Sequence, residues 1–235
     1  MGVVLGVTLG MVAGAVAAVV VAALVFWAVL AAATGTVLRM IGARPVREDE
    51  YPRLANVVEG LCATFGLRPP EVWVVADPVP NACSLGRSAS AGVLVVTTGL
   101  VDRLGLIETE GVVAHELAHI KRHDTQVAAV AVLVVGPLAW IFGRDDWLHT
   151  AVGRGREFAA DELATAAVRY PPGLHDALCA ITHGASAMAG TRFTGRTLAM
   201  TRWIWVDPWV GKGPGASLEG ELDATPVRIA ALAER

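Results

Sequence analysis

The segment His115-Glu116-Leu117-Ala118-His119 places two imidazoles and a carboxylate within five residues. Residues four apart share one face of a helix, so both histidines can bind a single metal ion. Two imidazoles with an open coordination position suit Zn²⁺, and Glu116 can hold a water beside the ion without binding the ion itself. The segment therefore predicts a hydrolytic zinc site in which Glu116 acts as the general base on zinc-bound water.

A catalytic zinc ion needs a third protein ligand. Arg122 stands where the extended motif HExxHxxGxxH has its glycine, so that extension does not supply the ligand. The run from residue 154 to 164 offers Glu157 and Asp161, which lie four apart and share one face of a predicted helix. We expect Glu157 to complete the metal site and Asp161 to accept a hydrogen bond from a zinc-bound imidazole.

The elements that must position these side chains are amphipathic helices and short strands. Apolar residues at helical spacing predict helices over residues 47–65 and 107–123. Runs of β-branched residues predict strands over 72–75 and 93–97. The polar residues between 81 and 91 predict a loop that joins the two strands.

An uncharged stretch from Gly2 to Leu38 begins the sequence, which is 54% hydrophobic and has a mean hydropathy of +0.53. This stretch far exceeds the roughly 20 apolar residues that cross a bilayer as a helix. We expect one tilted transmembrane helix over residues 1–38, followed by a domain over residues 39–235 that carries the zinc site. A cleaved signal peptide is disfavoured, because such peptides place a basic segment before a core of about 7–15 apolar residues.

Basic residues flank only one end of this predicted span, at Arg39, Arg44 and Arg47. Short basic flanks tend to stay in the cytoplasm, so we expect a single-pass protein of the cell membrane with a cytoplasmic domain. Small residues at a spacing of four form a stripe on which another transmembrane helix could pack. The stripe consists of Gly6, Gly10 and Gly14.

A second uncharged stretch runs from Thr125 to Gly143. Its apolar part, residues 127–142, would extend about 24 Å as a helix, which is short for a membrane span. The pair Gly136-Pro137 also interrupts it. Because the predicted zinc ligands come from both sides of this stretch, a single crossing would separate them across the membrane. We therefore expect either a buried core helix or a segment that dips into the membrane surface.

Charge and cysteine content argue against further classes of protein. The formal net charge is -3, the pI is near 6.1 and the basic residues form no dense block, so a nucleic-acid partner is not expected. The three cysteines, Cys62, Cys83 and Cys179, are odd in number and form no CxxC pair. This pattern argues against a disulfide framework and against a cysteine zinc ribbon.

The pairing of the HExxH segment with the downstream pattern RxREFxADxxA, Arg154 to Ala164, resembles the M48 family of metallopeptidases, and within it the membrane-anchored HtpX-like branch. The resemblance implies an α+β, predominantly helical fold of the zincin-like (gluzincin) type, with a small β-sheet after the transmembrane helix. Other similar stretches occur in the same order along the chain. They are Asn81-Ala82, Gly86-Arg87, residues 95–100 and Ile120-Lys121.

The resemblance also implies roles for individual residues. The three metal ligands and the general base named above match the family's zinc ligands and base. The strand before the HExxH helix would align an extended peptide substrate through residues such as Val93 and Val95, and Asn81 would lie near the scissile bond. The implied function is a membrane-anchored endopeptidase with one Zn²⁺ per chain, acting on misfolded or membrane-associated proteins.

The chain departs from the family pattern in two ways. Thr225 stands where the family has a histidine that stabilises the transition state, so the oxyanion donor stays open, with Arg202 and His183 as candidates. HtpX-like proteins also carry two hydrophobic passes before the domain and further membrane segments between the motifs. A catalytically weak or inactive zinc-binding adaptor is therefore the alternative. An intramembrane protease is disfavoured by the charged residues around the HExxH segment, which are Glu108, Glu110, Lys121 and Arg122.

Overall fold

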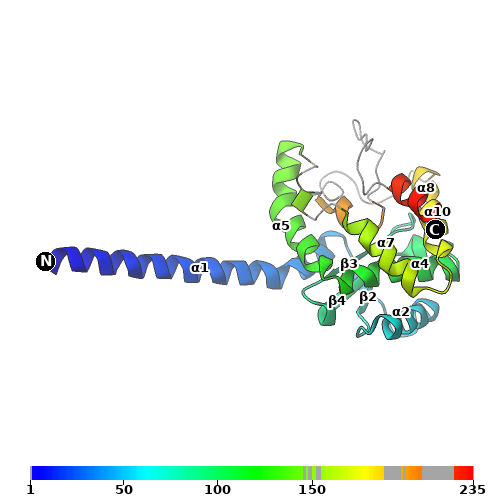
Figure 1. Ribbon diagram of the computed structural model, residues 1–235, viewed down its shortest axis with the longest axis horizontal. Coiled ribbons are helices and arrows are strands. Elements are labelled where there is room, and N and C mark those ends of the chain that lie inside the picture. Colours follow the sequence, from blue (N-terminus) through cyan, green and yellow to red (C-terminus); the bar gives the residue numbers. More distant parts are fainter. Residues whose placement is uncertain are drawn as a thin grey trace.

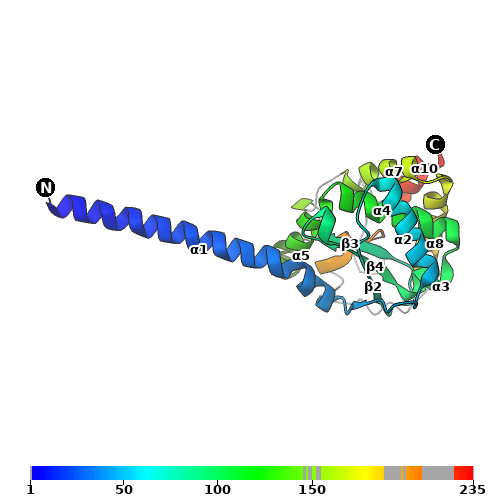
Figure 2. The same cartoon turned by 90° about the horizontal axis from the view of Figure 1, so that it is seen from below.

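The computed structural model describes residues 2–144, 147, 150–151, 155–187, 197, 200–207 and 225–234. Arg154, the first residue of the downstream motif, lies outside these residues. A long helix, α1 (Gly2–Met40), projects from a compact domain, as Figures 1 and 2 show from two directions. The domain is mostly helical and contains one small mixed sheet.

Helix α1 is continuous from Gly2 to Met40, which confirms the prediction of one long helix. Large apolar side chains between Met11 and Trp27 are exposed, and Trp27 itself is 69% exposed. From Ala33 onward the helix is partly buried, and Val37 is fully buried against the domain. The predicted boundary at residue 38 therefore falls inside the helix, because its last turns belong to the core of the domain.

The sheet has four strands in the order β1-β2-β4-β3. Strand β2 (Glu71–Val75) pairs in parallel with β4 (Gly92–Thr97), whereas β1 (Arg44–Pro45) and β3 (Ala82–Gly86) pair antiparallel with their neighbours. The prediction of a loop over 81–91 was wrong for Ala82–Gly86. Small and polar residues give this segment no strand pattern, but it is fully buried and contacts α4 (Leu106–Lys121) and α5 (Asp124–Phe142).

Eight further helical segments are described in the domain, besides the short η1 (Ala89–Ala91). They are α2 (Pro52–Phe65), α3 (Thr98–Arg103), α4 (Leu106–Lys121), α5 (Asp124–Phe142), α7 (Arg156–Ala167), α8 (Pro172–Ala187), η2 (Arg202–Ile204) and α10 (Thr225–Ala233). The predicted helix start at residue 47 was wrong. Asp49 takes a left-handed conformation with φ of 62°, and Pro52 occupies the first turn, where its missing N–H costs nothing.

Helix α4 carries the HExxH segment through the centre of the domain. It packs against α2, α7 and α8, and its residues from Gly111 to Ile120 are buried. Gly111 permits the close approach of α8, because a Cβ atom there would lie 2.6 Å from the backbone nitrogen of Leu174. Packing on several sides fixes the position of α4 and of the motif that it carries.

Helix α5 follows α4 directly and continues through Gly136 and Pro137 to Phe142. The expected interruption at this pair was therefore wrong, although a proline within a helix does remove one backbone hydrogen bond. Residues on one side of α5, including Ala128 and Val132, pack on α1 and β3. Other large side chains of α5 are exposed, so the helix is not a wholly buried core helix.

Candidate metal centre

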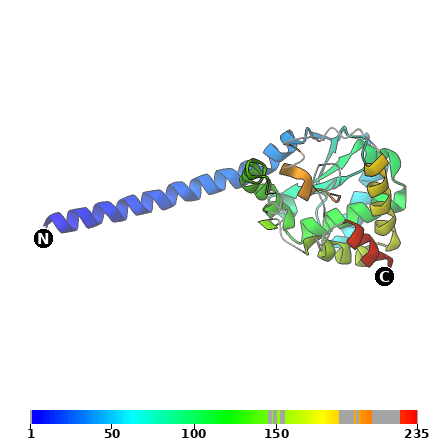
Figure 3. The same cartoon turned by 90° about the horizontal axis from the view of Figure 1, so that it is seen from above.

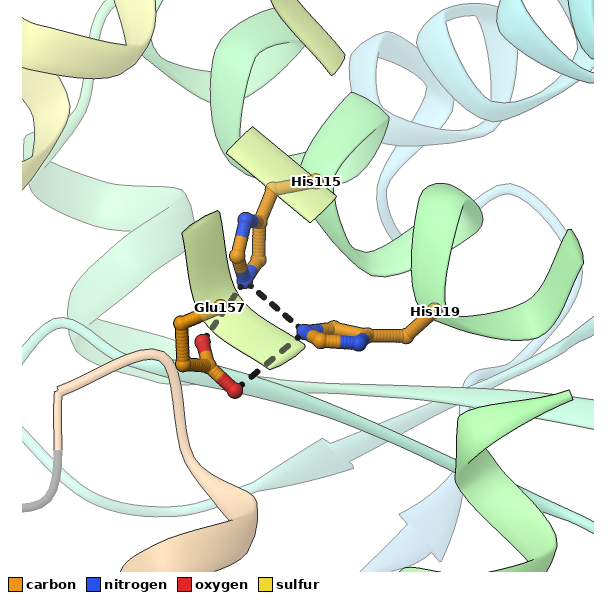
Figure 4. A group of neighbouring side chains, drawn as sticks. All are labelled: His115, His119 and Glu157. Carbon is orange, nitrogen blue, oxygen red and sulfur yellow. Dashed lines mark hydrogen bonds and ion pairs between the residues drawn. The ribbon is translucent and has the colours of Figure 1, made fainter. Parts of the chain in front are cut away.

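His115 and His119 lie one turn apart on α4 and point towards the start of α7 (Figure 4). Both residues are buried, with exposed fractions of 0% and 4%. Their Nε2 atoms are 3.1 Å apart, and their rings are nearly perpendicular, with an angle of 88° between the planes. The spacing of four residues therefore brings the two imidazoles to one point, as predicted.

Glu157 approaches the same point from the first turn of α7. Its Oε2 lies 3.2 Å from His115 Nε2, and its Oε1 lies 3.4 Å from His119 Nε2 (Figure 4). Gly155, with φ of 73°, precedes the helix and lets the chain turn into it, and a helix N-terminus favours a carboxylate. One ligand atom from each of the three residues lies within 4.8 Å of the others.

These separations fit the chemistry of zinc. A tetrahedral zinc ion with bonds of about 2.0–2.1 Å holds its ligand atoms roughly 3.3 Å apart. The three observed separations, 3.1, 3.2 and 3.4 Å, lie close to that value. Two imidazole nitrogens and one carboxylate are also a common donor set of catalytic zinc sites, which keep a fourth position open.

Two carboxylates hold the imidazoles from behind. His115 Nδ1 lies 2.8 Å from Asp161 Oδ1, and His119 Nδ1 lies 3.1 Å from Asp124 Oδ2. Each Nδ1–H donates to its carboxylate, which leaves Nε2 directed at the common point. The two Nε2 lone pairs would repel at 3.1 Å, so the arrangement is stable only with a proton or a cation between them.

Arg228, from α10, sits beneath the metal centre and is 1% exposed. Its guanidinium donates from Nε and Nη2 to the two carboxylate oxygens of Asp161, at 2.8 and 2.7 Å, and from Nη1 to the Val206 carbonyl. Nη1 also lies 3.2 Å from Glu157 Oε2, while Arg156 contacts the other oxygen of Glu157 at 2.9 Å. The two arginines thus offset the negative charge that gathers behind the histidines.

The pKa values follow from these contacts. Burial and Arg228 lower the pKa of His115, but the carboxylates of Asp161 and Glu157 outweigh them and raise it to about 9. Burial raises the pKa of Glu157, but His119, Arg156 and hydrogen bonds from the imidazoles bring it well below its usual range. The pKa of Asp161 is lowered too, since Arg228 and His115 outweigh its burial. Zinc needs neutral imidazole, so binding would displace a proton from this cluster.

Glu116, unlike His115, His119 and Glu157, is not among the residues whose ligand atoms meet at the common point. It is 1% exposed, and its Oε2 has no hydrogen-bond partner among the described residues. Burial and the charge of Glu116 raise the pKa of the Cys83 thiol in β3, the strand that α4 contacts. A buried carboxylate oxygen without a partner normally carries a free-energy cost, and a water held for reaction is one physical reason to retain it.

The strand predicted to align a substrate lies inside the sheet and not at its edge. Val93 and Val95 belong to β4, which pairs with β2 on one edge and β3 on the other. The backbone of β4 is therefore not available to a substrate strand, and the edge position belongs to β3. Part of that edge pairs with the chain itself, because Cys83 forms a bridge with Trp205.

Asn81 is buried and engaged in structural hydrogen bonds. Its Nδ2 donates to the Asp207 carbonyl at 2.7 Å, and its Oδ1 accepts from the backbone N–H groups of Ala82 and Asp207. The Thr225 hydroxyl donates to the Asp207 carboxylate at 2.8 Å. Asn81 and Thr225 therefore tie the 205–207 segment to β3 and α10, and the role of Asn81 near a scissile bond stays a prediction.

The two alternative oxyanion donors lie in different parts of the domain. His183 is exposed on α8, where its Nδ1 donates to the Cys179 carbonyl at 2.6 Å. Arg202 lies in η2 with its guanidinium over the ring of Trp203, 4.9 Å from the ring centroid. The carbonyl of Trp203 accepts a hydrogen bond from Arg156, so η2 lies beside the arginine that holds Glu157.

Asp124 and Arg228 are site residues that the sequence reasoning missed. Asp124 stands five residues after His119, where the helix direction changes and spacing arguments no longer hold. Arg228 lies 67 residues beyond its partner Asp161 in the sequence. The sequence does mark Arg228 in one way, as the single cation within the mostly apolar run Thr225–Ala233. An arginine on a helix that packs into the core needs a buried partner for its charge.

We expect the substitution Asp124→Ala to weaken zinc binding by about 10–100-fold, because His119 would lose the carboxylate that orients its ring. Titration of the full chain against a competing chelator measures this affinity. Asp102→Ala removes an exposed aspartate of α3 and serves as the matched control. Equal zinc affinity of the Asp124→Ala variant and the control would show that Asp124 does not position His119.

Comparison with known proteins agrees with this geometry. The sequence model of peptidase family M48 matches residues 48–201, about two thirds of the chain. A protein named "Protease HtpX homolog" from Dictyoglomus thermophilum is 36% identical over 176 residues, covering 60% of this chain and 58% of that protein. The homologue from Tropheryma whipplei strain Twist is 29% identical over 228 residues, covering 83% of this chain and 76% of that protein.

A third relative with the same name, from Thermodesulfovibrio yellowstonii, is 39% identical over 118 residues, covering 50% of this chain and 42% of that protein. The chain thus spans less than three fifths of the length of the Dictyoglomus protein. The match to the family nevertheless includes the whole HExxH helix and the start of α7 with Glu157. The family resemblance seen in the sequence is confirmed, and the chain belongs to peptidase family M48, with HtpX-like proteases as its relatives.

Proposed function

We propose that the protein is a membrane-anchored zinc endopeptidase. The observation that carries this proposal is the meeting of His115 Nε2, His119 Nε2 and the Glu157 carboxylate at separations of 3.1–3.4 Å, with both Nδ1 atoms held by carboxylates. A histidine pair with a glutamate as third ligand is also the donor set of the gluzincin type of fold, to which we assign the domain.

The residues of the chain divide the chemistry between them. The two histidines and Glu157 would hold the ion, and zinc, when bound, supplies Lewis acidity that makes water nucleophilic near neutral pH. Glu116, buried beside His115, takes a proton from the attacking water at its carboxylate and delivers it to the leaving amine nitrogen. Asp161 and Asp124 keep the imidazoles oriented throughout.

Several features support a place at the membrane. Helix α1 is long and apolar enough to cross a bilayer, and an 18-residue window between residues 11 and 40 reaches a mean hydropathy of 2.7. The basic residues Arg39, Arg44 and Arg47 follow it, which favours a single pass with the domain in the cytoplasm. Gly14 is open to a partner helix, since a Cβ atom there would meet nothing within 4 Å. Substrates of the proposed enzyme would be misfolded or membrane-associated proteins, the class that the resemblance implies.

A zinc-binding adaptor without proteolysis is the second candidate, and one observation favours it. Thr225 replaces the family's histidine, and its hydroxyl is committed to Asp207. The chain thus supplies no imidazole at that position. An adaptor would bind one zinc ion per chain and leave unfolded proteins intact.

Cleavage of casein by the full chain in lipid nanodiscs tests the proposal. We expect hydrolysis that stops when a chelator removes the metal and returns when stoichiometric Zn²⁺ is added. The substitution Glu162→Gln, at an exposed glutamate of α7, should leave the rate unchanged. Full zinc occupancy without cleavage of casein or of a detergent-solubilised membrane protein would favour the adaptor and contradict the endopeptidase.

A further inference from the structure

Helix α5 runs across the direction of α1, at the end of the domain from which α1 projects. Figure 1 shows the two helices at a steep angle, and Figure 3 views α5 almost along its own axis while α1 lies in the plane of the picture. The two helices contact each other directly. If α1 crosses the membrane, α5 therefore lies roughly along the membrane plane.

The two sides of α5 differ in size and exposure. The side that packs on the domain consists largely of small residues, which let α5 approach α1 and β3 closely. The outer side is a stripe of large apolar residues that are 47–63% exposed. The stripe consists of Val127, Val134, Leu138 and Ile141, and Phe142 lies beside its end. Nothing polar interrupts this stripe, and water is a poor solvent for it.

The depth of α5 follows from the part of α1 that it contacts. The uncharged stretch of α1 begins at Gly2 and is longer than a bilayer is thick, and the 20 residues that lead up to its buried part, 11–30, would form about 30 Å of helix, the hydrocarbon thickness of a bilayer. The buried part of α1 begins at Ala33, one turn beyond this segment, and α1 contacts α5 directly. With residues 11–30 in the hydrocarbon, α5 thus lies at the boundary between the hydrocarbon and the headgroups. Its exposed apolar side then continues the exposed apolar surface of α1.

Polar and aromatic residues mark the same level. A cavity of 220 Å³ lies where α1, the turn between β3 and β4, and α5 meet, and it is lined by Trp27, Arg87 and Gln126 among others. At the far end of α5, the guanidinium of Arg144 lies 5.3 Å from the ring centroid of Trp147. Tryptophan and arginine are favoured at the headgroup level of a bilayer.

We propose that α5 lies flat in the membrane interface, with its outer stripe among the acyl chains of the leaflet that faces the domain. This inference rests on the proposed membrane anchoring by α1. A crossing by α5 would carry the chain away from α7, although Glu157 must return to within 3.4 Å of His119. A fully buried position disagrees with the exposed stripe. The phospholipid surface is the occupant that fits a stripe continuous with α1.

The arrangement ties the metal centre to the membrane surface. Asp124 is the first residue of α5 and holds the imidazole of His119. The HExxH helix ends three residues earlier, at Lys121. The site therefore lies close above the lipid headgroups, where segments of membrane proteins that leave the bilayer become accessible.

Spin labels on the outer stripe of the full chain in nanodiscs test this orientation. Single cysteines replace Val127, Val134 and Ile141 in a Cys179→Ala background, since Cys62 and Cys83 are buried. Power saturation with oxygen and a nickel chelate gives the depth of each label. We expect all three labels within about 5 Å of one depth, some 5–10 Å below the phosphates. A crossing helix would separate the labels at 127 and 141 by about 21 Å.

Two further labels separate failure of this inference from failure of the anchoring. A label at Val20 of α1 should lie deep in the hydrocarbon, and a label at Val227 of α10 should stay in water. A deep Val20 label together with water-exposed labels on α5, or with labels at graded depths, overturns the flat orientation alone. A Val20 label in water overturns both proposals. Circular dichroism and retained cleavage of casein verify the fold of each variant.

Discussion

Replacing Glu116 with glutamine is expected to lower kcat/KM for peptide hydrolysis by about 10²–10⁴-fold, the usual contribution of a general base. Glutamine keeps the shape and the buried position of the side chain but cannot take a proton from water. The buried Oε2 atom of Glu116, which has no partner among the described residues, marks the acceptor that would be lost. Steady-state cleavage of a fluorogenic peptide by the full chain measures the effect.

Zinc content separates this effect from damage to the site. The Glu116→Gln variant should retain one zinc ion per chain, because the metal-facing atoms belong to other residues. Glu162→Gln, the same chemical change at an exposed position of α7, should cleave at the wild-type rate. Substantial residual cleavage by pure Glu116→Gln protein would mean that another group takes the proton.

The substitution Glu157→Ala should abolish stoichiometric zinc binding and proteolysis together. It removes the acidic donor of the cluster, so the loss of zinc affinity should exceed the roughly 10–100-fold that removal of a supporting carboxylate causes. It also leaves Arg156 and Arg228 without their shared counter-charge. Competition titration with a chelator measures the affinity, and cleavage of the fluorogenic peptide measures the activity.

A second variant guards against unfolding as the explanation. Glu157→Gln keeps a hydrogen-bond acceptor for the two arginines, but a neutral amide is a poor zinc ligand. We expect this variant to unfold at a temperature near that of the wild type and still to bind zinc weakly. Wild-type zinc affinity in both Glu157 variants would remove this residue from the metal centre.

The sequence predicted the parts of the site that local spacing determines. A separation of four residues puts His115 and His119 on one side of a helix, and the same rule pairs Glu157 with Asp161. The structure brings all four together. The helix over 107–123 was predicted to within two residues, since its apolar period is undisturbed and Gly105 precedes it.

The sequence could not predict features that arise from packing. Strand β3 contains small residues with no alternation, and it is a strand because β4 and two helices surround it. The pairing order that puts β3 at the edge depends on the whole sheet. Arg228 reaches the site only because α10 packs against α7 and α8. The orientation of α5 depends on its contact with α1, whereas its composition equally suits a crossing helix or a core helix.

The central claim is that one metal ion is held jointly by the two histidines of α4 and by Glu157. The most direct measurement is a crystal structure of the zinc-loaded full chain, with anomalous diffraction recorded on both sides of the zinc edge. We predict a single strong anomalous peak at about 2.0–2.2 Å from His115 Nε2, His119 Nε2 and a carboxylate oxygen of Glu157. A peak bound elsewhere, or a peak at the histidines with the Glu157 carboxylate turned away, would contradict the claim.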